Sequence, residues 1–440
     1  MKKRLPWVLG LLCALAAATL LTALLPLRNA AADFQAQSPR DQNLAVFDTA
    51  SLLLEEHHYR GQLFEDASWA EHRAHWREKA ASELPALLYV NVLENFARGF
   101  PDSHVSFIAP IPAQESRETP QHAANDRVMR HLEAALSGPG YQQSRLSRGG
   151  RVHTIVGDVM RGSPAERAGV TPGWLQMESS WTLDEEGAHF RASFVGLSHD
   201  ELRTLERMGL PGEFATQQLL DEFIAARRVE VAFDMAKLPL TTDFDTRQLP
   251  GGVTYVRFDR YESMDLITKT LDAIDAAGSQ GVVLDLRHNV GGRALHMARV
   301  IGAFLGNNVS IGTTHRAGKS APMTSLRLTD HYEGPVVVLI GPNTASAAEI
   351  TAASLQDHKR ARLVGRSTSG AVLMGRKFAL PDGGALMIPV EDFWRAGERH
   401  IEGVGVEPDV WITPTLEDVR AGRDPVLERA LQELDSFARE

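Results

Sequence analysis

Short apolar runs alternate with amphipathic stretches in the second half of the chain, from residue 251 onward. The run 336–340 is branched, uncharged and bounded by turn residues, which is typical of a buried strand. The stretch 347–357 carries helix formers and neither glycine nor proline. Such alternation predicts parallel strands joined by right-handed crossovers, and therefore an α/β fold. We expect elements at 253–258, 264–277, 281–286, 294–305, 336–340, 347–357 and 363–364.

The pattern is helical nearer the N-terminus, where apolar residues from Leu44 to Phe100 recur at helix-like offsets among charged residues. This predicts a helical N-terminal region, residues 33–112. Gly99 and Pro101 end its last helix and introduce the short segment 102–107. The polar stretch that follows predicts a linker, residues 113–145.

The middle of the chain, residues 146–240, has strand-like pieces around a run from Gly162 to Gly173. This run resembles the central motif of PDZ domains, with two departures. Trp174 stands where the motif has aspartate, and residues 178–203 have the pattern of an insertion. The alternative is a proline- and glycine-punctuated loop and helix in an ordinary domain. We expect the remaining residues to form a core, 241–415, and a C-terminal helix, 416–440.

The first 32 residues have the pattern of an export signal. Basic residues at 2–4 precede the apolar stretch 7–25, and Ala30 and Ala32 would suit cleavage before Asp33. Because the apolar stretch is nearly long enough to span a bilayer, an uncleaved anchor in the inner membrane stays open. Either way, we expect a periplasmic or extracellular protein. Cys13, the only cysteine, lies in this leader, so the mature chain has no thiol nucleophile, disulfide or cysteine-ligated metal.

Charge and histidine spacing narrow the function classes further. The net charge is −10, and it becomes −14 without the four basic residues of the leader, which disfavours nucleic acid as a partner. His57, His58, His72 and His75 do not form the His-Glu-x-x-His spacing of zinc peptidases. We therefore predict no metal ion and no cofactor.

Ser346 is the leading candidate nucleophile because it lies between the predicted strand 336–340 and the helix that follows. The first amides of a helix have no partner inside it and carry partial positive charge, so the amide of Ala347 could stabilise an oxyanion. Parallel strands bring their following loops to one edge of the sheet, where catalytic groups collect. The alternative is that Ser346 or Thr344 only caps the helix.

A second loop, residues 287–292, is expected at the same edge. It ends in Gly291 and Gly292, and paired glycines let a backbone approach a substrate without an intervening Cβ. The amide of Gly292 is thus a candidate second oxyanion donor. A plain turn is the alternative.

Three segments together carry a resemblance to a known family. They are Val-Val-Leu-Asp-Leu-Arg-His-Asn-Val-Gly-Gly at 282–292, Thr-Ala-Ser-Ala-Ala-Glu-Ile at 344–350 and Gly-Val-Gly-Val-Glu-Pro-Asp at 403–409. In this order they resemble the C-terminal processing and tricorn-type family of serine peptidases. The resemblance implies a crotonase-like or Clp-protease-like β/α core, Ser346 as the nucleophile, and a peptide or protein substrate.

The resemblance also bears on the general base. Members with a Ser-Lys dyad carry lysine where this chain has Ala371, and Lys377, six residues later, is interpreted as a solvated strand residue. Tricorn-like members use a histidine from an Asp-x-His segment, which matches residues 102–104 here and implies His104 as the base. In these members a serine just before the histidine and a downstream glutamate form a relay with the base. The resemblance therefore implies Ser103 and Glu402 in that role. The alternatives are local capping for Ser103 and a solvated loop charge for Glu402.

These observations favour an exported, metal-independent serine endopeptidase of the Ser-His branch. The alternative is a catalytically inactive protein of the same fold that binds peptides or apolar ligands. Asp285 and Arg287 flank a buried strand, and we interpret them as a structural pair.

Overall fold

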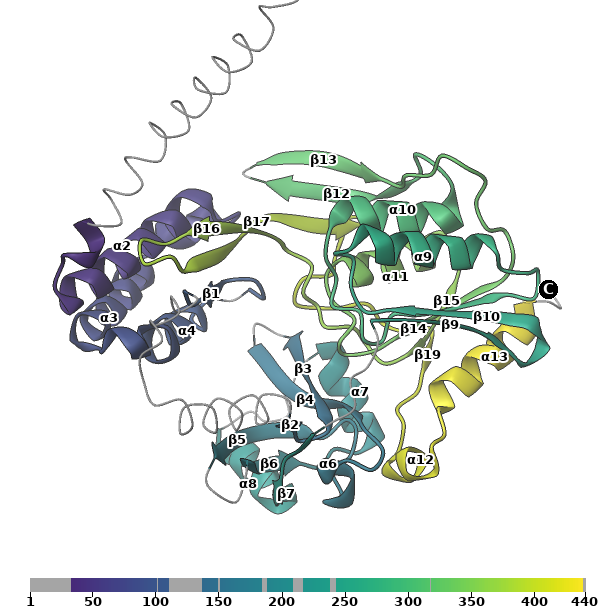
Figure 1. Ribbon diagram of the computed structural model, residues 1–440, viewed down its shortest axis with the longest axis horizontal. Coiled ribbons are helices and arrows are strands. Elements are labelled where there is room, and N and C mark those ends of the chain that lie inside the picture. The colour runs from purple at the N-terminus through teal and green to yellow at the C-terminus, as the bar shows by residue number, and fades with distance from the viewer. Residues whose placement is uncertain are drawn as a thin grey trace, which may run out of the picture. The chain divides into compact units, whose positions relative to one another are not determined.

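The computed structural model describes residues 33–100, 102–110, 137–148, 151–183, 188–208, 217–237, 243–316 and 318–437. These residues separate into two compact units (Figure 1). The first contains the described residues among 33–100, 104–110 and 375–390, and the second contains the rest. Within the described ranges, no helix is both long and apolar enough to cross a membrane. The expected leader, residues 1–32, lies outside them.

The first unit is mainly helical, as the pattern from Leu44 to Phe100 predicted. Ser38 and Asp66 cap its two long helices by accepting hydrogen bonds from backbone amides in the first turn. Phe47, Leu93 and Phe96 are fully buried between the helices. The elements are α2 (Pro39–His57), η1 (Gly61–Phe64), α3 (Ala67–Ser82), η2 (Pro85–Leu87), the π-helical η3 (Leu88–Leu93), α4 (Glu94–Ala97), β1 (Ser106–Ile108), β16 (Met374–Ala379) and the first half of β17 (Ala385–Arg395).

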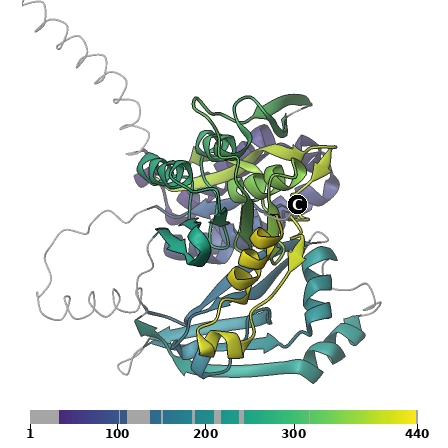
Figure 2. The ribbon, with the colours of Figure 1, turned by 90° about the vertical axis from the view of Figure 1, so that its right-hand side faces the viewer.

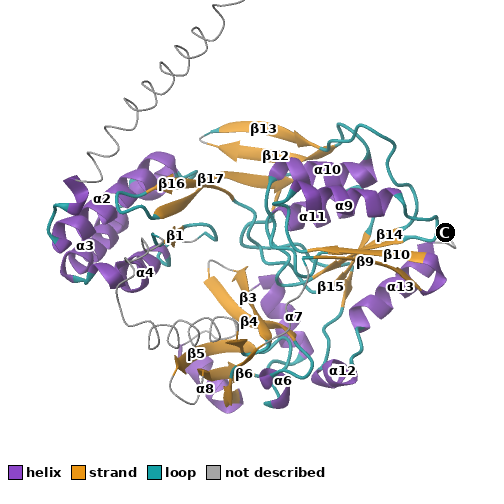
Figure 3. Cartoon of the chain, in the orientation of Figure 1, coloured by secondary structure: helices purple, strands orange, loops and turns teal. Residues whose placement is uncertain are grey.

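The middle domain of the second unit, defined here as residues 137–237, is a five-stranded antiparallel sheet with helices (Figure 3). Ser163 caps α6 (Pro164–Arg167) inside the Gly162–Gly173 run. The strand order is β3 (Tyr141–Arg148), β4 (Arg151–Val159), β5 (Leu175–Leu183), β6 (Ala188–Val195) and β7 (Arg228–Asp234). The domain also contains β2 (Ser137–Gly138), its partner β8 (Ala236–Lys237), α7 (His199–Met208) and α8 (Gln217–Arg227).

Two expectations for this region are corrected. The sheet begins before residue 146, because β2 and the first part of β3 fall within the expected linker, 113–145. Tyr141–Arg148 is polar in sequence because it is an edge strand with one exposed face. Residues 178–203 are not a separate insertion, since they supply most of the β5–β6 hairpin and the first half of α7.

The core of the second unit is a six-stranded sheet whose predicted strands and helices are confirmed. Its strands alternate between two apolar layers: Val336, Val338 and Ile340 pack under the crossover helices, and Val337 and Leu339 pack against the C-terminal helix. All neighbouring strands are parallel except β9 with β10. The order is β19 (Val410–Trp411), β15 (Arg362–Gly365), β14 (Val336–Ile340), β11 (Val282–Asp285), β10 (Val253–Phe258) and β9 (Phe244–Leu249).

Helices cover both faces of this sheet. In Figure 1, α9 (Met264–Asp275), α10 (Ala294–Leu305) and α11 (Ala347–Asp357) lie on one side and α13 (Pro425–Phe437) on the other. A separate set of strands, which the sequence pattern did not predict, joins β12 (Ser310–Arg316), β13 (Lys319–Thr324), the second half of β17 and β18 (Arg399–His400). The short η4 (Pro250–Gly252) precedes β10.

The C-terminal segment contains two helices where one, 416–440, was expected. The first, α12 (Leu416–Ala421), ends at Gly422, whose φ of 69° lies in the left-handed region that ends helices. Pro425 then occupies the first position of α13. Both helices are yellow in Figure 2.

Candidate active site

Ser346 occupies the junction between β14 and α11, as predicted. Its φ of 55° and ψ of −121° are unusual for a residue other than glycine, so the surrounding contacts must hold this turn in place. The buried hydroxyl of Thr344 supplies one of them, because it accepts from the amide of Gly341 and donates to the carbonyl of Leu286. Ser346 also stands at the N-cap position of α11.

The glycine loop after β11 is joined directly to this turn. Asn289 is buried; its side-chain amide donates to the carbonyl of Phe258, its side-chain oxygen accepts from the amide of Gly291, and its carbonyl accepts from the amide of Ala345. Gly291 has φ of 93°, and a Cβ built on it would lie 2.6 Å from the Cβ of Ser346. Only glycine therefore fits beside the serine.

The two expected oxyanion donors are the amides of Gly292 and Ala347. Gly292 forms a parallel bridge with Tyr261, in which Tyr261 bonds to the carbonyl of Gly291 and the amide of Arg293. That pattern turns the amide of Gly292 away from Tyr261. Among the residues that the structure describes, neither the Gly292 amide nor the Ala347 amide has a hydrogen-bond acceptor.

A buried carboxylate that the sequence analysis did not single out also holds the turn that carries Ser346, called the serine turn below. Glu349, in the first turn of α11, accepts from the amides of Ser346, Gly370 and Ala371 and from the hydroxyl of Thr368. Burial raises the pKa of this carboxyl, although these hydrogen bonds act in the opposite direction. The sequence signal that could have identified Glu349 was its position three residues after Ser346, which is the spacing of a capping box.

Glu402 accepts two backbone hydrogen bonds, from the amide of Ser103 at 3.1 Å and from that of Val372 at 2.8 Å. Its pKa is raised to about 7, mainly by burial and in smaller part by the Glu349 carboxyl, against the lowering effect of its hydrogen bonds. The alternative of a solvated loop charge is therefore wrong for Glu402. Glu402 contacts Ser103 through both the amide and the side chain of Ser103. The relay that these two residues were expected to form with His104 stays a prediction.

The candidate bases lie in the first unit. A Cβ built on Gly375 would lie 3.8 Å from Cδ2 of His104, which places the imidazole beside the start of β16. Lys377 is exposed on that strand, in agreement with its interpretation as a solvated strand residue. In the second unit Ala371 uses its backbone: its amide donates to Glu349 and its carbonyl accepts from the Ser346 amide. The pairing of His104 with Ser346 stays a prediction.

Comparisons with known proteins agree with this geometry. Residues 252–412 match the family model of peptidase family S41. This segment is an S41 peptidase domain. It contains Ser346, the glycine pair, Glu349 and Glu402. Within the described part of the chain, no group of three or more His, Cys, Asp or Glu side chains could hold a metal ion.

Several curated relatives are named as processing proteases. The chain is 29% identical over 284 residues to the carboxyl-terminal-processing protease of Synechocystis, with 62% of each chain covered. It is 30% identical to that of Picosynechococcus, over 56% of this chain and 58% of the relative. It is 24% identical to carboxy-terminal processing protease CtpA of Bacillus subtilis, over 58% and 52%. The matched region is less than two thirds of each of these relatives.

Solved structures share the fold. The photosystem II D1 C-terminal processing protease has a TM-score of 0.55 at 18% identity, covering 84% of this chain and 93% of its own. The tricorn protease has a TM-score of 0.51 at 17% identity, covering 92% of this chain and 37% of its own. At these identities the likeness shows a common architecture.

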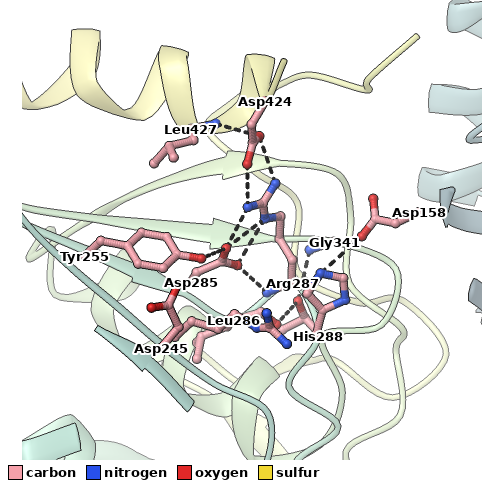
Figure 4. A network of polar contacts seen from close by, with 12 residues as sticks. Asp158, Asp245, Tyr255, Asp285, Leu286, Arg287, His288, Gly341, Asp424 and Leu427 are labelled. Carbon is pink, nitrogen blue, oxygen red and sulfur yellow. Dashed lines mark hydrogen bonds and ion pairs between the residues drawn. The ribbon is translucent and has the colours of Figure 1, made fainter. Parts of the chain in front are cut away.

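The glycine loop of the S41 domain is anchored at successive positions (Figure 4). Arg287 lies between two carboxylates, Asp285 at 2.6 Å and Asp424 at 2.8 Å, and Tyr255 donates to Asp285. This confirms Asp285 and Arg287 as a structural pair. His288 reaches the other way, to Asp158 on β4 of the middle domain at 3.4 Å.

The segment 366–371 connects the middle domain to the serine turn. Arg366 and the amide of Ser367 bind Glu206 on α7, and the hydroxyl of Ser369 donates to the carbonyl of Arg145 on β3. The residues between and after them, at 368, 370 and 371, bind Glu349 instead. The segment is thus held on one side by the middle domain and on the other by the helix that carries Ser346.

Proposed function

We propose that this chain is an exported, metal-independent serine peptidase in which Ser346 is the nucleophile and His104 the general base. The observation that carries the proposal is the serine turn itself. A serine with positive φ stands against Gly291, and the amides of Gly292 and Ala347 are left without an acceptor among the described residues. Two such donors are what an oxyanion requires, which supports the proposal. The names of the processing proteases that resemble the chain support a peptide or protein substrate.

The reaction follows from these roles. The Ser346 oxygen attacks the carbonyl carbon of a peptide bond while His104 takes the hydroxyl proton. The amides of Gly292 and Ala347 hold the negative oxygen of the tetrahedral intermediate. His104 then gives its proton to the leaving amine as the carbon–nitrogen bond breaks, which leaves an acyl ester on Ser346. Water, deprotonated by His104, hydrolyses the ester and regenerates the serine. Ser103 and Glu402 would orient the imidazole, because a third group usually fixes the base.

The test is hydrolysis and active-site labelling of matched variants. We expect Ser346→Ala and His104→Ala each to lower kcat/KM for peptide hydrolysis by at least about 10⁴-fold. Both should also abolish labelling by a serine-directed phosphonate. Lys377→Ala should keep full activity, and so should His75→Ala, which removes an exposed histidine of the first unit.

The outcomes separate the possible errors. If Lys377→Ala inactivates the protein and His104→Ala does not, the assigned base is wrong. If the unaltered chain neither hydrolyses peptides nor accepts the label, yet binds peptides or apolar ligands, the chain is the inactive binding protein that the replacement of lysine by Ala371 leaves open.

A further inference from the structure

Glu349 is a buried acid that the proposed chemistry does not use. Its side chain is fully buried, and its four hydrogen-bond donors are one hydroxyl and three backbone amides. Among the described residues it forms no ion pair with lysine, arginine or histidine. Since burying a carboxyl without a cation is unfavourable, its place here requires an explanation.

Both oxygens of Glu349 are fully engaged by donors. Oε1 accepts from Thr368 Oγ1 and the amide of Gly370, and Oε2 accepts from the amides of Ala371 and Ser346. An ionised carboxylate is an acceptor only, which matches this set of donors. Any proton added to the carboxyl would face one of these donors. The hydrogen bonds therefore favour the charged form, and burial acts against them.

The contacts exceed what capping of α11 needs. A capping-box glutamate reaches back only to the amide of the N-cap residue, here Ser346. Glu349 also binds three donors from residues 368–371, which lie 19 to 22 positions further along the chain. The carbonyl of Ala371 in turn accepts from the amide of Ser346. Glu349 and the turn 370–372 thus hold the nucleophile's backbone from two sides.

Most backbone amides at the start of α11 have a hydrogen-bond acceptor in this arrangement. The Ser346 amide donates to the Glu349 side chain and the Ala371 carbonyl, and the Ala348 amide donates to the Ala345 carbonyl. The Glu349 amide faces the Ser346 side chain in the capping box, and the Ile350 amide donates to the Ser346 carbonyl. Ala347 is left as the amide of this turn that can face a substrate oxygen. A helix start normally leaves several amides open, and the Glu349 carboxyl itself occupies that of Ser346.

We propose that Glu349 is a positioning residue, which locks the turn 370–372 onto Ser346 and so fixes the directions of the Ser346 hydroxyl and the Ala347 amide. The catalytic part of this proposal rests on the proposed peptidase function. Its structural part, the lock itself, can be measured without any activity.

The decisive variant is Glu349→Gln, which keeps the shape but replaces one acceptor oxygen with a donor. Glu407→Gln is the matched control, because Glu407 is exposed and not in the serine turn. We expect hydrogen exchange of the amides of Ser346, Gly370 and Ala371 to speed up in Glu349→Gln alone. With a peptide substrate, kcat should fall about 100-fold while KM changes little, as misplaced reacting groups produce. A peptide aldehyde, which mimics the tetrahedral intermediate, should bind correspondingly more weakly.

A second variant guards against simple misfolding. Thr368→Val removes one of the four donors to Glu349 and, with it, the acceptor of the Val406 amide. It should lower kcat in the same direction by a smaller factor. The double variant should be no worse than Glu349→Gln, because both changes act through one lock.

The results separate the proposals. Unchanged amide exchange in Glu349→Gln, or faster exchange with unchanged kcat and aldehyde affinity, overturns the positioning role while the peptidase function stands. An unaltered chain that neither hydrolyses peptides nor accepts the phosphonate overturns the peptidase function and the catalytic part of this proposal. Faster exchange in Glu349→Gln would then support the lock alone.

Discussion

Arg366 and Glu206 form an ion pair that is buried on both sides. Their side chains are 4% and 0% exposed, and their nearest charged atoms lie 2.6 Å apart. Glu206 belongs to α7 of the middle domain and also accepts from the indole of Trp411. Arg366 is the first residue of the segment 366–371, whose last residues contact the serine turn. The pair therefore ties the middle domain to the chain beside the candidate nucleophile.

Removing one partner of this pair should be strongly destabilising, because the other would remain buried and uncompensated. We expect Glu206→Ala to lower the free energy of unfolding by about 3–5 kcal/mol. Urea denaturation measures this directly. Glu262→Ala, which breaks the exposed pair with Arg293, is the control and should have little effect. Equal effects of the two substitutions would contradict the burial of the Arg366 pair.

Gly291→Ala should displace Ser346, because the substitution adds a steric clash to the cost of placing alanine at the positive φ of residue 291. Positive φ costs an alanine about 1–2 kcal/mol, and the added Cβ would lie 2.6 Å from the Cβ of Ser346 and 2.9 Å from the carbonyl oxygen of Ala345. Gly251→Ala is a matched control, since Gly251 has φ of 82° and no atom within 4 Å of an added Cβ. Thermal unfolding should show both losses, and phosphonate labelling should fail in Gly291→Ala alone. Normal labelling of Gly291→Ala would mean that the turn can move aside.

Strands could be predicted most reliably from the sequence where their side chains are buried on both faces. Side chains of the run 336–340 are buried on both faces of the core sheet. The segment is therefore apolar throughout and can be recognised from its own residues alone. Tyr141–Arg148 was missed because an edge strand with polar residues resembles a linker. The strands β12 and β13 form a local hairpin that the sequence pattern did not reveal, and the pairing of β12 with β17 joins distant segments, which no local pattern predicts.

The same distinction applies to the candidate site. Ser346, Gly291 and Gly292 could be found because each stands in a local motif. The role of Glu349 could not, because three of its four donors come from residues about 20 positions away. Glu402 stands beside glycine in a short loop, and only the fold shows that it accepts from Ser103 and Val372.

Asp285→Asn should weaken the anchor of the glycine loop in a pH-dependent way. Burial acts to raise the pKa of Asp285, but the Arg287 guanidinium outweighs it and holds the pKa well below the ordinary 3.8. The ionised carboxylate therefore contributes stability above pH 3.8, and this contribution is lost as the pH falls further. At pH 7 the variant should unfold at lower urea concentration than the unaltered chain. The difference should shrink only below pH 3.8, and a difference independent of pH down to pH 3 would argue against the ion pair as its source.

Glu402 should show the opposite dependence, because its pKa is raised from 4.5 to about 7. Between these two values an unfolded chain ionises this carboxyl while the folded chain keeps it protonated, so the folded state loses stability as the pH rises. Glu402→Gln cannot ionise and avoids this loss. Its free energy of unfolding, relative to the unaltered chain, should therefore increase from pH 4.5 to pH 7 and stay level above. A flat profile for Glu402→Gln would show that burial does not govern the titration of Glu402.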